Sequence, residues 1–405
     1  MGIKSAFFLA INFPNCYNFA AMDPEIHQLV QTIHDCRSKL VLVAAGAGTQ
    51  ALSDLLGVAG ATRTLLEALI PYSEAAFNEF LGQKPPQYVA DETARLLAGR
   101  AFTRARWLNP GGQRVIGLAC TATIITDRPK RGQHRAHIAT WQPSRLICHR
   151  IQLHKGTRDR AGEEDIVSRI LLNSLAQACG FQQRVPVPLT AGDALIVNVT
   201  DFRQLIEQLQ RTEIKYFSIS DNGHTVSDQS PPELLLSGAF NPLHDGHLEM
   251  ARVAGQLHGK EVAFELAVDN ADKTPLEKSV SLQRISQFAG RYTIFASNAP
   301  TFIAKARLYP GTTFIVGYDT AVRILHPRYY GNSVENLETA LDEIITRGCH
   351  FLVAGRTGED GVFRRARDLG IPAKYRDLFE RIPSSLFRKD ISSSELRRTG
   401  GKGSR

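Results

Sequence analysis

The feature that most constrains the fold is a series of short, continuous apolar segments that alternate with amphipathic helical patterns. In the first half such segments cover residues 39–44, 115–120 and 137–140, and in the second half they cover 234–237 and 313–316. Strands that are apolar at nearly every position and alternate with helices are typical of a parallel sheet buried on both faces. The sequence therefore predicts an α/β protein built on parallel sheets.

The chain is too long for one ordinary domain, because it has 405 residues and a domain usually has about 150. Residues 183–232 interrupt the alternation with prolines, short strand-like pieces and turn sequences. Such a composition is typical of a domain boundary. We therefore predict a first domain over residues 22–182, a connecting segment over 183–232, and a second domain over 233–398.

The first 21 residues begin with a lysine and a short apolar run, as a signal peptide does. Asn12 and Pro14 interrupt that run, which favours an extended or misassigned start before a domain that begins near Met22. The six cysteines are scattered and include no Cys-x-x-Cys pair, which indicates a reduced, cytoplasmic protein without a zinc site. No apolar run reaches about eighteen residues, so neither a transmembrane helix nor a membrane partner is expected.

The charge balance is mildly basic, since 48 lysines and arginines against 40 aspartates and glutamates give a net charge of +8. This excess suits an anionic ligand such as a nucleotide as well as it suits nucleic acid. No dense stripe of lysine and arginine alternates with aromatic residues. Nucleic acid is therefore not an expected partner.

The most informative segment is 238–247, which reads Gly-Ala-Phe-Asn-Pro-Leu-His-Asp-Gly-His between an apolar strand and a helix predicted over 248–257. Free backbone N–H groups and the positive end of a helix dipole attract phosphate oxygens. His244 and His247 are three positions apart, so both can face the same phosphate and donate hydrogen bonds to it. An isolated pair of this kind could equally be a helix cap with incidental histidines, but the preceding Gly-x-Phe-Asn-Pro favours a functional site.

This segment resembles the HxGH superfamily of nucleotidyltransferases, which includes nicotinamide mononucleotide adenylyltransferase and phosphopantetheine adenylyltransferase. Residues 391–397, Ile-Ser-Ser-Ser-Glu-Leu-Arg, are similar to the second phosphate-binding signature of that family. Alone, they could be an ordinary serine N-cap with a solvated arginine. The resemblance implies a Rossmann-like domain in which His244, His247 and Arg397 serve catalysis. It further implies nucleotide binding by Gly238, Phe240, Asn241, Gly246, Ser392, Ser393 and Ser394.

Residues 313–320 resemble the strand and Gly-x-Asp element that lines the site between the two substrates of pyridine-nucleotide adenylyltransferases. Through this resemblance Gly317 and Asp319 become candidates for acceptor binding, although Asp319 could equally cap the following helix. Arg356, at the end of a later strand, and Lys273, in a loop after the second strand, are candidates for the same role. A loop lysine, however, is most often simply solvated.

The resemblance implies that an acceptor phosphate attacks the α-phosphorus of ATP in line and expels pyrophosphate, without a protein nucleophile. Mg²⁺ would accompany the ATP, and no metal site made of protein side chains is predicted. The expected acceptor is a small phosphate like nicotinamide or nicotinate mononucleotide, and the expected assembly is a homo-oligomer. Cytidylyl transfer, phosphopantetheine adenylyl transfer and a non-catalytic nucleotide-binding regulator remain alternatives.

The first domain contains a glycine-rich turn after a strand, within residues 43–51, whose Gly-x-Gly-x-x-Ala pattern could be read as a dinucleotide fingerprint. No acidic residue follows a second strand about twenty residues later to bind a ribose. The wider sequence includes the segments 52–62, 71–77, 80–82, 116–121 and 155–158. Through these segments, residues 25–180 instead resemble the CinA-type nicotinamide mononucleotide deamidases, and this domain is predicted to be CinA-C-like. Gly46 stands where that family has its nucleophilic serine, and Phe77 stands where it has a lysine. We therefore predict a retained fold without deamidase activity, with a role in oligomerisation or in sensing a pyridine nucleotide.

Overall fold

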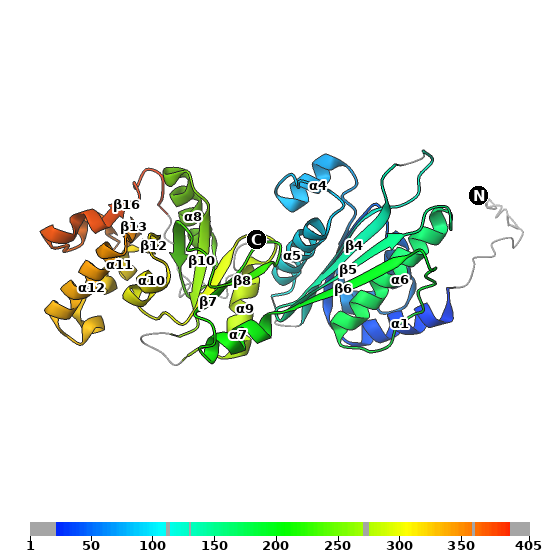
Figure 1. Ribbon diagram of the computed structural model, residues 1–405, viewed down its shortest axis with the longest axis horizontal. Coiled ribbons are helices and arrows are strands. Elements are labelled where there is room, and N and C mark those ends of the chain that lie inside the picture. Colours follow the sequence, from blue (N-terminus) through cyan, green and yellow to red (C-terminus); the bar gives the residue numbers. More distant parts are fainter. Residues whose placement is uncertain (1–21, 111–113, 129–130, 270–274, 359–360, 389–405) are drawn as a thin grey trace, which may run out of the picture.

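The computed structural model describes residues 22–110, 114–128, 131–269, 275–358 and 361–388. The described chain forms two α/β regions that lie side by side, each built around its own sheet (Figure 1). No helix among these residues is long and apolar enough to cross a membrane. The fold is thus the predicted pair of α/β regions.

The first sheet has six strands in the order β2-β1-β3-β4-β5-β6. These strands are β1 (Lys39–Ala45), β2 (Leu65–Leu69), β3 (Val115–Thr123), β4 (His134–Trp141), β5 (Arg145–Leu153) and β6 (Ala194–Asp201). Strands β1, β2 and β3 are parallel, as predicted, whereas β3, β4, β5 and β6 pair antiparallel. The prediction of a parallel sheet is wrong for this part, because the short turn 142–144 between β4 and β5 forces the chain to reverse direction.

Helices cover both faces of this sheet. They are α1 (Pro24–Asp35), α2 (Thr49–Gly57), α3 (Ala61–Thr64), α4 (Glu74–Leu81), α5 (Asp91–Leu108) and α6 (Arg160–Cys179). Val41 and Val43 of β1 pack in the core cluster that contains α5, and Leu40 and Leu42 pack in the cluster that contains α1 and α6. Alternate residues of the strand therefore face opposite layers, which explains why β1 is apolar at nearly every position.

The second sheet has eight strands in the order β16-β13-β12-β9-β10-β11-β7-β8. They are β7 (Tyr216–Ile219), β8 (Thr225–Ser227), β9 (Leu234–Ser237), β10 (Val262–Ala267), β11 (Ile294–Ser297), β12 (Thr313–Gly317), β13 (His350–Ala354) and β16 (Phe379–Arg381). All pairs from β16 to β11 are parallel, and β7 and β8 add an antiparallel edge. From β9 the chain winds outward through β10 and β11, and it then returns to β12 on the other side of β9. The predicted Rossmann-like parallel sheet is confirmed.

The remaining elements surround this second sheet. The α-helices are α7 (Phe202–Gln210), α8 (Asp245–His258), α9 (Lys278–Ile285), α10 (Phe302–Leu308), α11 (Tyr318–Ile324) and α12 (Val334–Thr346). Short 3₁₀ turns are η1 (Ser286–Phe288), η2 (Pro327–Tyr330), η3 (Ala366–Asp368) and η4 (Ala373–Leu378), and β14 (Arg356–Thr357) pairs with β15 (Phe363–Arg364).

Residues 183–232, predicted to connect two domains, take part in both sheets. Strand β6 pairs with β5 of the first sheet, α7 follows, and β7 and β8 form the edge of the second sheet. The strand-like pieces in this segment thus pair with strands of both sheets. A cut at residue 182 would remove an edge strand from the first sheet.

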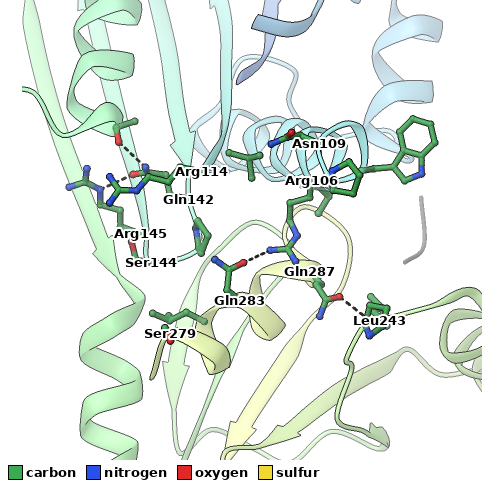
Figure 2. A pocket seen from close by; sticks show the side chains of 18 of the residues that line it. Arg106, Asn109, Arg114, Gln142, Ser144, Arg145, Leu243, Ser279, Gln283 and Gln287 are labelled. Atoms are coloured by element: carbon green, nitrogen blue, oxygen red, sulfur yellow. Dashed lines mark hydrogen bonds between the residues drawn. The ribbon is translucent and has the colours of Figure 1, made fainter. Parts of the chain in front are cut away.

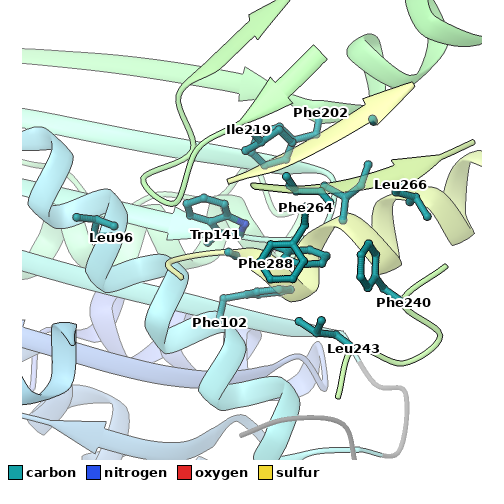
Figure 3. Packing of buried hydrophobic residues seen from close by; sticks show 14 of the residues in the cluster. Leu96, Phe102, Trp141, Phe202, Ile219, Phe240, Leu243, Phe264, Leu266 and Phe288 are labelled. Atoms are coloured by element: carbon teal, nitrogen blue, oxygen red, sulfur yellow. The ribbon is translucent and has the colours of Figure 1, made fainter. Parts of the chain in front are cut away.

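The two regions share one apolar core cluster (Figure 3). Phe102 of α5 and Trp141 of β4 come from the first region, and Phe202, Phe264 and Phe288 come from α7, β10 and η1. The rings of Trp141 and Phe202 lie 5.9 Å apart. Close packing of this kind fixes the position of one region against the other.

Candidate nucleotide-transfer site

The candidate site lies where the strand order of the second sheet reverses, between β9 and β12. Residues 238–244 follow β9, Gly317 ends β12, and Arg356 follows β13. Because parallel strands present their carboxyl ends at one edge, these segments meet there. A crevice at such a switch point is where open α/β sheets bind ligands. The structure thus gathers three separately predicted segments at one edge.

The two histidines stand at the beginning of α8. His244 is the N-cap residue and is buried, and its ring stacks on that of His247 with centroids 3.7 Å apart. The backbone N–H of His244 donates to Nδ1 of His247 at 3.3 Å. Since Nδ1 accepts, the proton of the neutral His247 ring is on Nε2. Within the described chain, Nδ1 of His244 is buried without a hydrogen-bond partner.

Both imidazoles are held neutral. Burial lowers the pKa of His247 to about 3, and the neighbouring His244 adds to this effect. Burial also lowers the pKa of His244. At neutral pH each ring therefore offers one N–H donor and no charge, which suits hydrogen bonding to an oxygen that gains charge during a reaction.

The loop before α8 is held by Phe240, a predicted nucleotide-binding residue that is buried here, and by two side chains that the sequence analysis did not identify, Gln287 and Arg284. Phe240 is buried with a positive φ of 43°, and its ring packs edge-on against His247 at 5.2 Å. The side-chain amide of Gln287 donates to the Phe240 carbonyl at 2.8 Å and accepts from the Leu243 N–H at 2.9 Å. Arg284 donates to the Ala239 carbonyl at 3.1 Å. These contacts hold the backbone that carries His244, and no local motif could have revealed the roles of Gln287 and Arg284.

Asp319 and Arg356 form an ion pair. Helix α11 begins with Gly317 as its N-cap, and Asp319 lies in the first turn. The alternative that Asp319 caps this helix is therefore not what the structure shows. The Arg356 charge contributes to lowering the pKa of His244, after the larger effect of burial. Arg356 thus lies near enough to His244 to disfavour its charged form.

The model of the cytidylyltransferase-like family matches residues 235–399. The C-terminal region is a cytidylyltransferase-like domain. The family match indicates a nucleotidyltransferase enzyme. No curated protein sequence matches the chain.

The structure describes only some of the other predicted site residues of the cytidylyltransferase-like domain. Gly246 is buried in the first turn of α8, and Asn241 is exposed in the preceding loop. Gly238 donates its N–H to the Glu265 carbonyl at 3.0 Å. Five predicted residues lie outside the described residues: Lys273, Ser392, Ser393, Ser394 and Arg397.

The described residues contain no group of three histidine, cysteine, aspartate or glutamate side chains that could hold a metal ion. Mg²⁺ usually binds through one or two carboxylates together with substrate phosphates, and it keeps several waters. A magnesium ion that enters with a triphosphate needs no such group of protein ligands.

The N-terminal region has a corresponding strand, glycine turn and helix, formed by β1 and α2. Here a side chain of the protein itself occupies the N-terminus of α2. Oε1 of Glu164, from α6, accepts from the N–H groups of Gly48 and Gln50 at 2.9 and 3.1 Å, and from the Thr49 hydroxyl at 3.2 Å. The protein's own carboxylate therefore occupies the place where an anion would bind.

The two positions that differ from the deamidase pattern are used for packing. Gly46 has a φ of 91°, and a Cβ there would overlap the Ala122 carbonyl oxygen. Phe77 is buried, with its ring edge-on to Tyr88 at 5.2 Å. A serine at 46 would therefore need a different backbone, and a charged lysine at 77 would lie in the core.

Several solved structures resemble the chain, although their similarity is low. A competence/damage-inducible protein from Agrobacterium tumefaciens is 19% identical, with a TM-score of 0.32, over 38% of this chain and 96% of the other. CinA-superfamily proteins from Escherichia coli and Enterobacter cloacae are 15% and 13% identical, with TM-scores of 0.30 and 0.29. These matches cover 38% and 44% of this chain, and 87% and 98% of the others.

Proposed function

We propose that the protein transfers the adenylyl group of ATP to the phosphate of an acceptor like nicotinamide or nicotinate mononucleotide, as a step in NAD biosynthesis. The observation that carries this proposal is the neutral, stacked pair of His244 and His247 at the N-terminus of α8. The Nε2–H of His247 and the free N–H groups of the helix can bind phosphate oxygens there. The ion pair of Asp319, in the first turn of α11, and Arg356, in β14, supports an acceptor site beside it.

In the proposed reaction, an acceptor phosphate oxygen forms a bond to the α-phosphorus of ATP. The bond from that phosphorus to the bridging oxygen breaks, and pyrophosphate leaves with the electron pair. The chain contributes positioning and hydrogen bonds: His244 and His247 face the α and β phosphates, and Ser392, Ser393, Ser394 and Arg397 hold the β and γ phosphates. Mg²⁺ bound to the triphosphate would neutralise part of its charge.

Cytidylyl transfer is the main competing reaction, and the matching family model carries that name. Against it, the segment 388–394 lacks the glycine of the Arg-Thr-x-Gly-Ile-Ser-Thr-Thr variant that cytidylyl enzymes have. Transfer to phosphopantetheine uses the same chemistry with another acceptor. A non-catalytic regulator is a further alternative, which the retained His244 and His247 make less suitable.

A pyrophosphate-release screen with the full chain tests these alternatives. ATP and CTP would each be combined with nicotinamide mononucleotide, nicotinate mononucleotide, phosphopantetheine and small phosphate monoesters. We expect release only with ATP and a pyridine mononucleotide. Release with CTP alone would establish a cytidylyltransferase instead, and no release with any pair would favour the regulator.

We also propose that the protein is a cytoplasmic homo-oligomer whose copies meet at β6. This edge strand exposes Leu195, Ile196, Val197 and Val199 by 37% to 57%. A second β6, running antiparallel, would pair its backbone and cover these side chains by two-fold symmetry. Val197→Lys should convert the oligomer to monomers in light scattering, whereas Val334→Lys, at an exposed valine of α12, should not. A wild-type monomer would refute this interface.

A further inference from the structure

A cavity of 960 Å³ lies between the two regions (Figure 2). Its walls come from the end of α5, the turn between β4 and β5, the helix α9 and the loop before α8. No described aspartate or glutamate lines this cavity. Five arginines line it: Arg106, Arg114, Arg145, Arg203 and Arg291.

Most of this positive charge has no carboxylate partner. Arg203 pairs with Asp201 at 2.6 Å, but the other four arginines form no salt bridge within the described chain. Arg106 donates only to neutral groups across the interface, Gln283 at 2.9 Å and Ser286 at 3.0 Å. Burial lowers the pKa of Arg106 to about 10. A partly desolvated cation without a counter-charge is costly, and a bound anion would offset that cost.

We propose that this cavity binds a diphosphate-bearing anion of up to nucleotide size. Arginine forks match phosphate oxygens in pairs, and the volume falls within the usual range for small-molecule sites. Trp107 also lines the cavity and offers an aromatic surface beside the arginines. The diphosphate could belong to free pyrophosphate or to a nucleotide such as ADP. If the nucleoside also contacts the cavity, ADP should bind more tightly than pyrophosphate.

The cavity is separate from the transfer site but shares a wall with it. His244 and His247 do not line it, whereas Pro242 and Leu243 do. Gln287 also lines it and holds the loop at Phe240 and Leu243. An anion in the cavity can therefore act as an effector, because it contacts the residue that positions the backbone ahead of His244.

Binding would be measured by calorimetry with the full chain, using inorganic pyrophosphate and ADP as separate probes. Tryptophan fluorescence identifies the site, because the chain has only two tryptophans and one of them, Trp107, lines the cavity. We expect both probes to change the emission, and Trp107→Phe to abolish that change while calorimetric binding persists. Binding without any change that depends on Trp107 would assign the heat to the transfer site and overturn the proposal.

Arginine variants provide the second test. Arg106→Gln should weaken probe binding about tenfold. Arg114→Gln should do the same, at an exposed residue whose side chain makes no described hydrogen bond. Arg150→Gln is the matched control, because Arg150 is exposed on β5 with Arg145 and does not line the cavity. Equal affinity in all three variants and the wild type would refute the site. These measurements need no turnover, so their outcome does not depend on the proposed adenylyl transfer.

Discussion

Both regions contain the same strand–turn–helix element, but the N-terminus of its helix is occupied by a carboxylate in one region and open in the other. In each, a central parallel strand leads through a glycine-containing turn into a helix, β1 into α2 and β9 into α8. At α2 the N-terminal N–H groups are bound by Glu164, whereas at α8 two neutral histidines stand beside the helix N-terminus, one with an unpaired buried nitrogen. Access to the helix N-terminus, rather than its presence, decides which region can bind a phosphate.

The residues around the two turns also differ in what they do: those of the first pack in the core, and those of the second support the loop. Gly46 and Phe77 use their space for close backbone approach and core packing. Phe240 and Gln287, in contrast, hold a loop and a histidine ring in place without covering them completely. In the first region the residues around the turn contribute to packing, whereas in the second region they support a site that stays open.

The largest effect is expected from His247→Ala. Loss of a donor aimed at developing charge should reduce the rate of nucleotidyl transfer by about 10²–10³. The fold should persist, because the ring stacks on His244 at the edge of the sheet and does not span the core. Pyrophosphate release measures the rate and a thermal melt checks folding.

His258→Ala, at the other end of α8, is the control and should retain its activity. Transfer near the wild-type rate in His247→Ala would make the histidine structural, and the contrast with α2 would lose its functional meaning.

A smaller effect is expected from Arg397→Ala. The arginine is proposed to hold the β and γ phosphates, so the KM for the triphosphate should rise about tenfold, as for a lost charged hydrogen bond. The KM for the acceptor should change little. Steady-state kinetics with each substrate varied in turn would separate the two.

Arg397→Lys should recover only part of the loss, because a point charge cannot reproduce the forked contact. An unchanged KM for the triphosphate in Arg397→Ala would remove this residue from the site.

Much of the fold was predictable because its signals are local. The apolar runs located β1, β3, β9 and β12, and the Gly-x-Phe-Asn-Pro segment located the start of α8. The direction of β4 and β5 was missed, because periodicity reports burial on both faces and not strand direction.

The supporting side chains were beyond sequence reasoning for another reason. Glu164 is 116 residues from Gly48, and Gln287 is 47 residues from Phe240. Each contact depends on how helices pack on the sheet, and no spacing in the chain encodes it. The pairing of Asp319 with Arg356 was likewise hidden, although each residue was a separate candidate.

Glu164→Ala tests the filled end of α2 directly. The variant leaves two N–H groups and a hydroxyl without their acceptor, which should cost about 1–2 kcal/mol of unfolding free energy, as for a lost N-cap. Urea titration of the full chain would measure it. Glu79→Ala, at an exposed position on α4, should cost much less. Equal costs would mean that water replaces Glu164 easily, and that α2 is more open than it looks.

The smallest expected effect is no effect: the full chain should release no ammonia from nicotinamide mononucleotide. Amide hydrolysis needs an oxygen nucleophile and a group that takes its proton. Thr49, three positions after Gly46, is the hydroxyl nearest to the missing serine along the sequence, and it donates to Glu164. That carboxylate oxygen already accepts hydrogen bonds from two backbone N–H groups, so it is engaged as a cap of α2. Ammonia release above background that disappears in Thr49→Ala would show instead that the nucleophile has moved by three positions, and that both regions are enzymes.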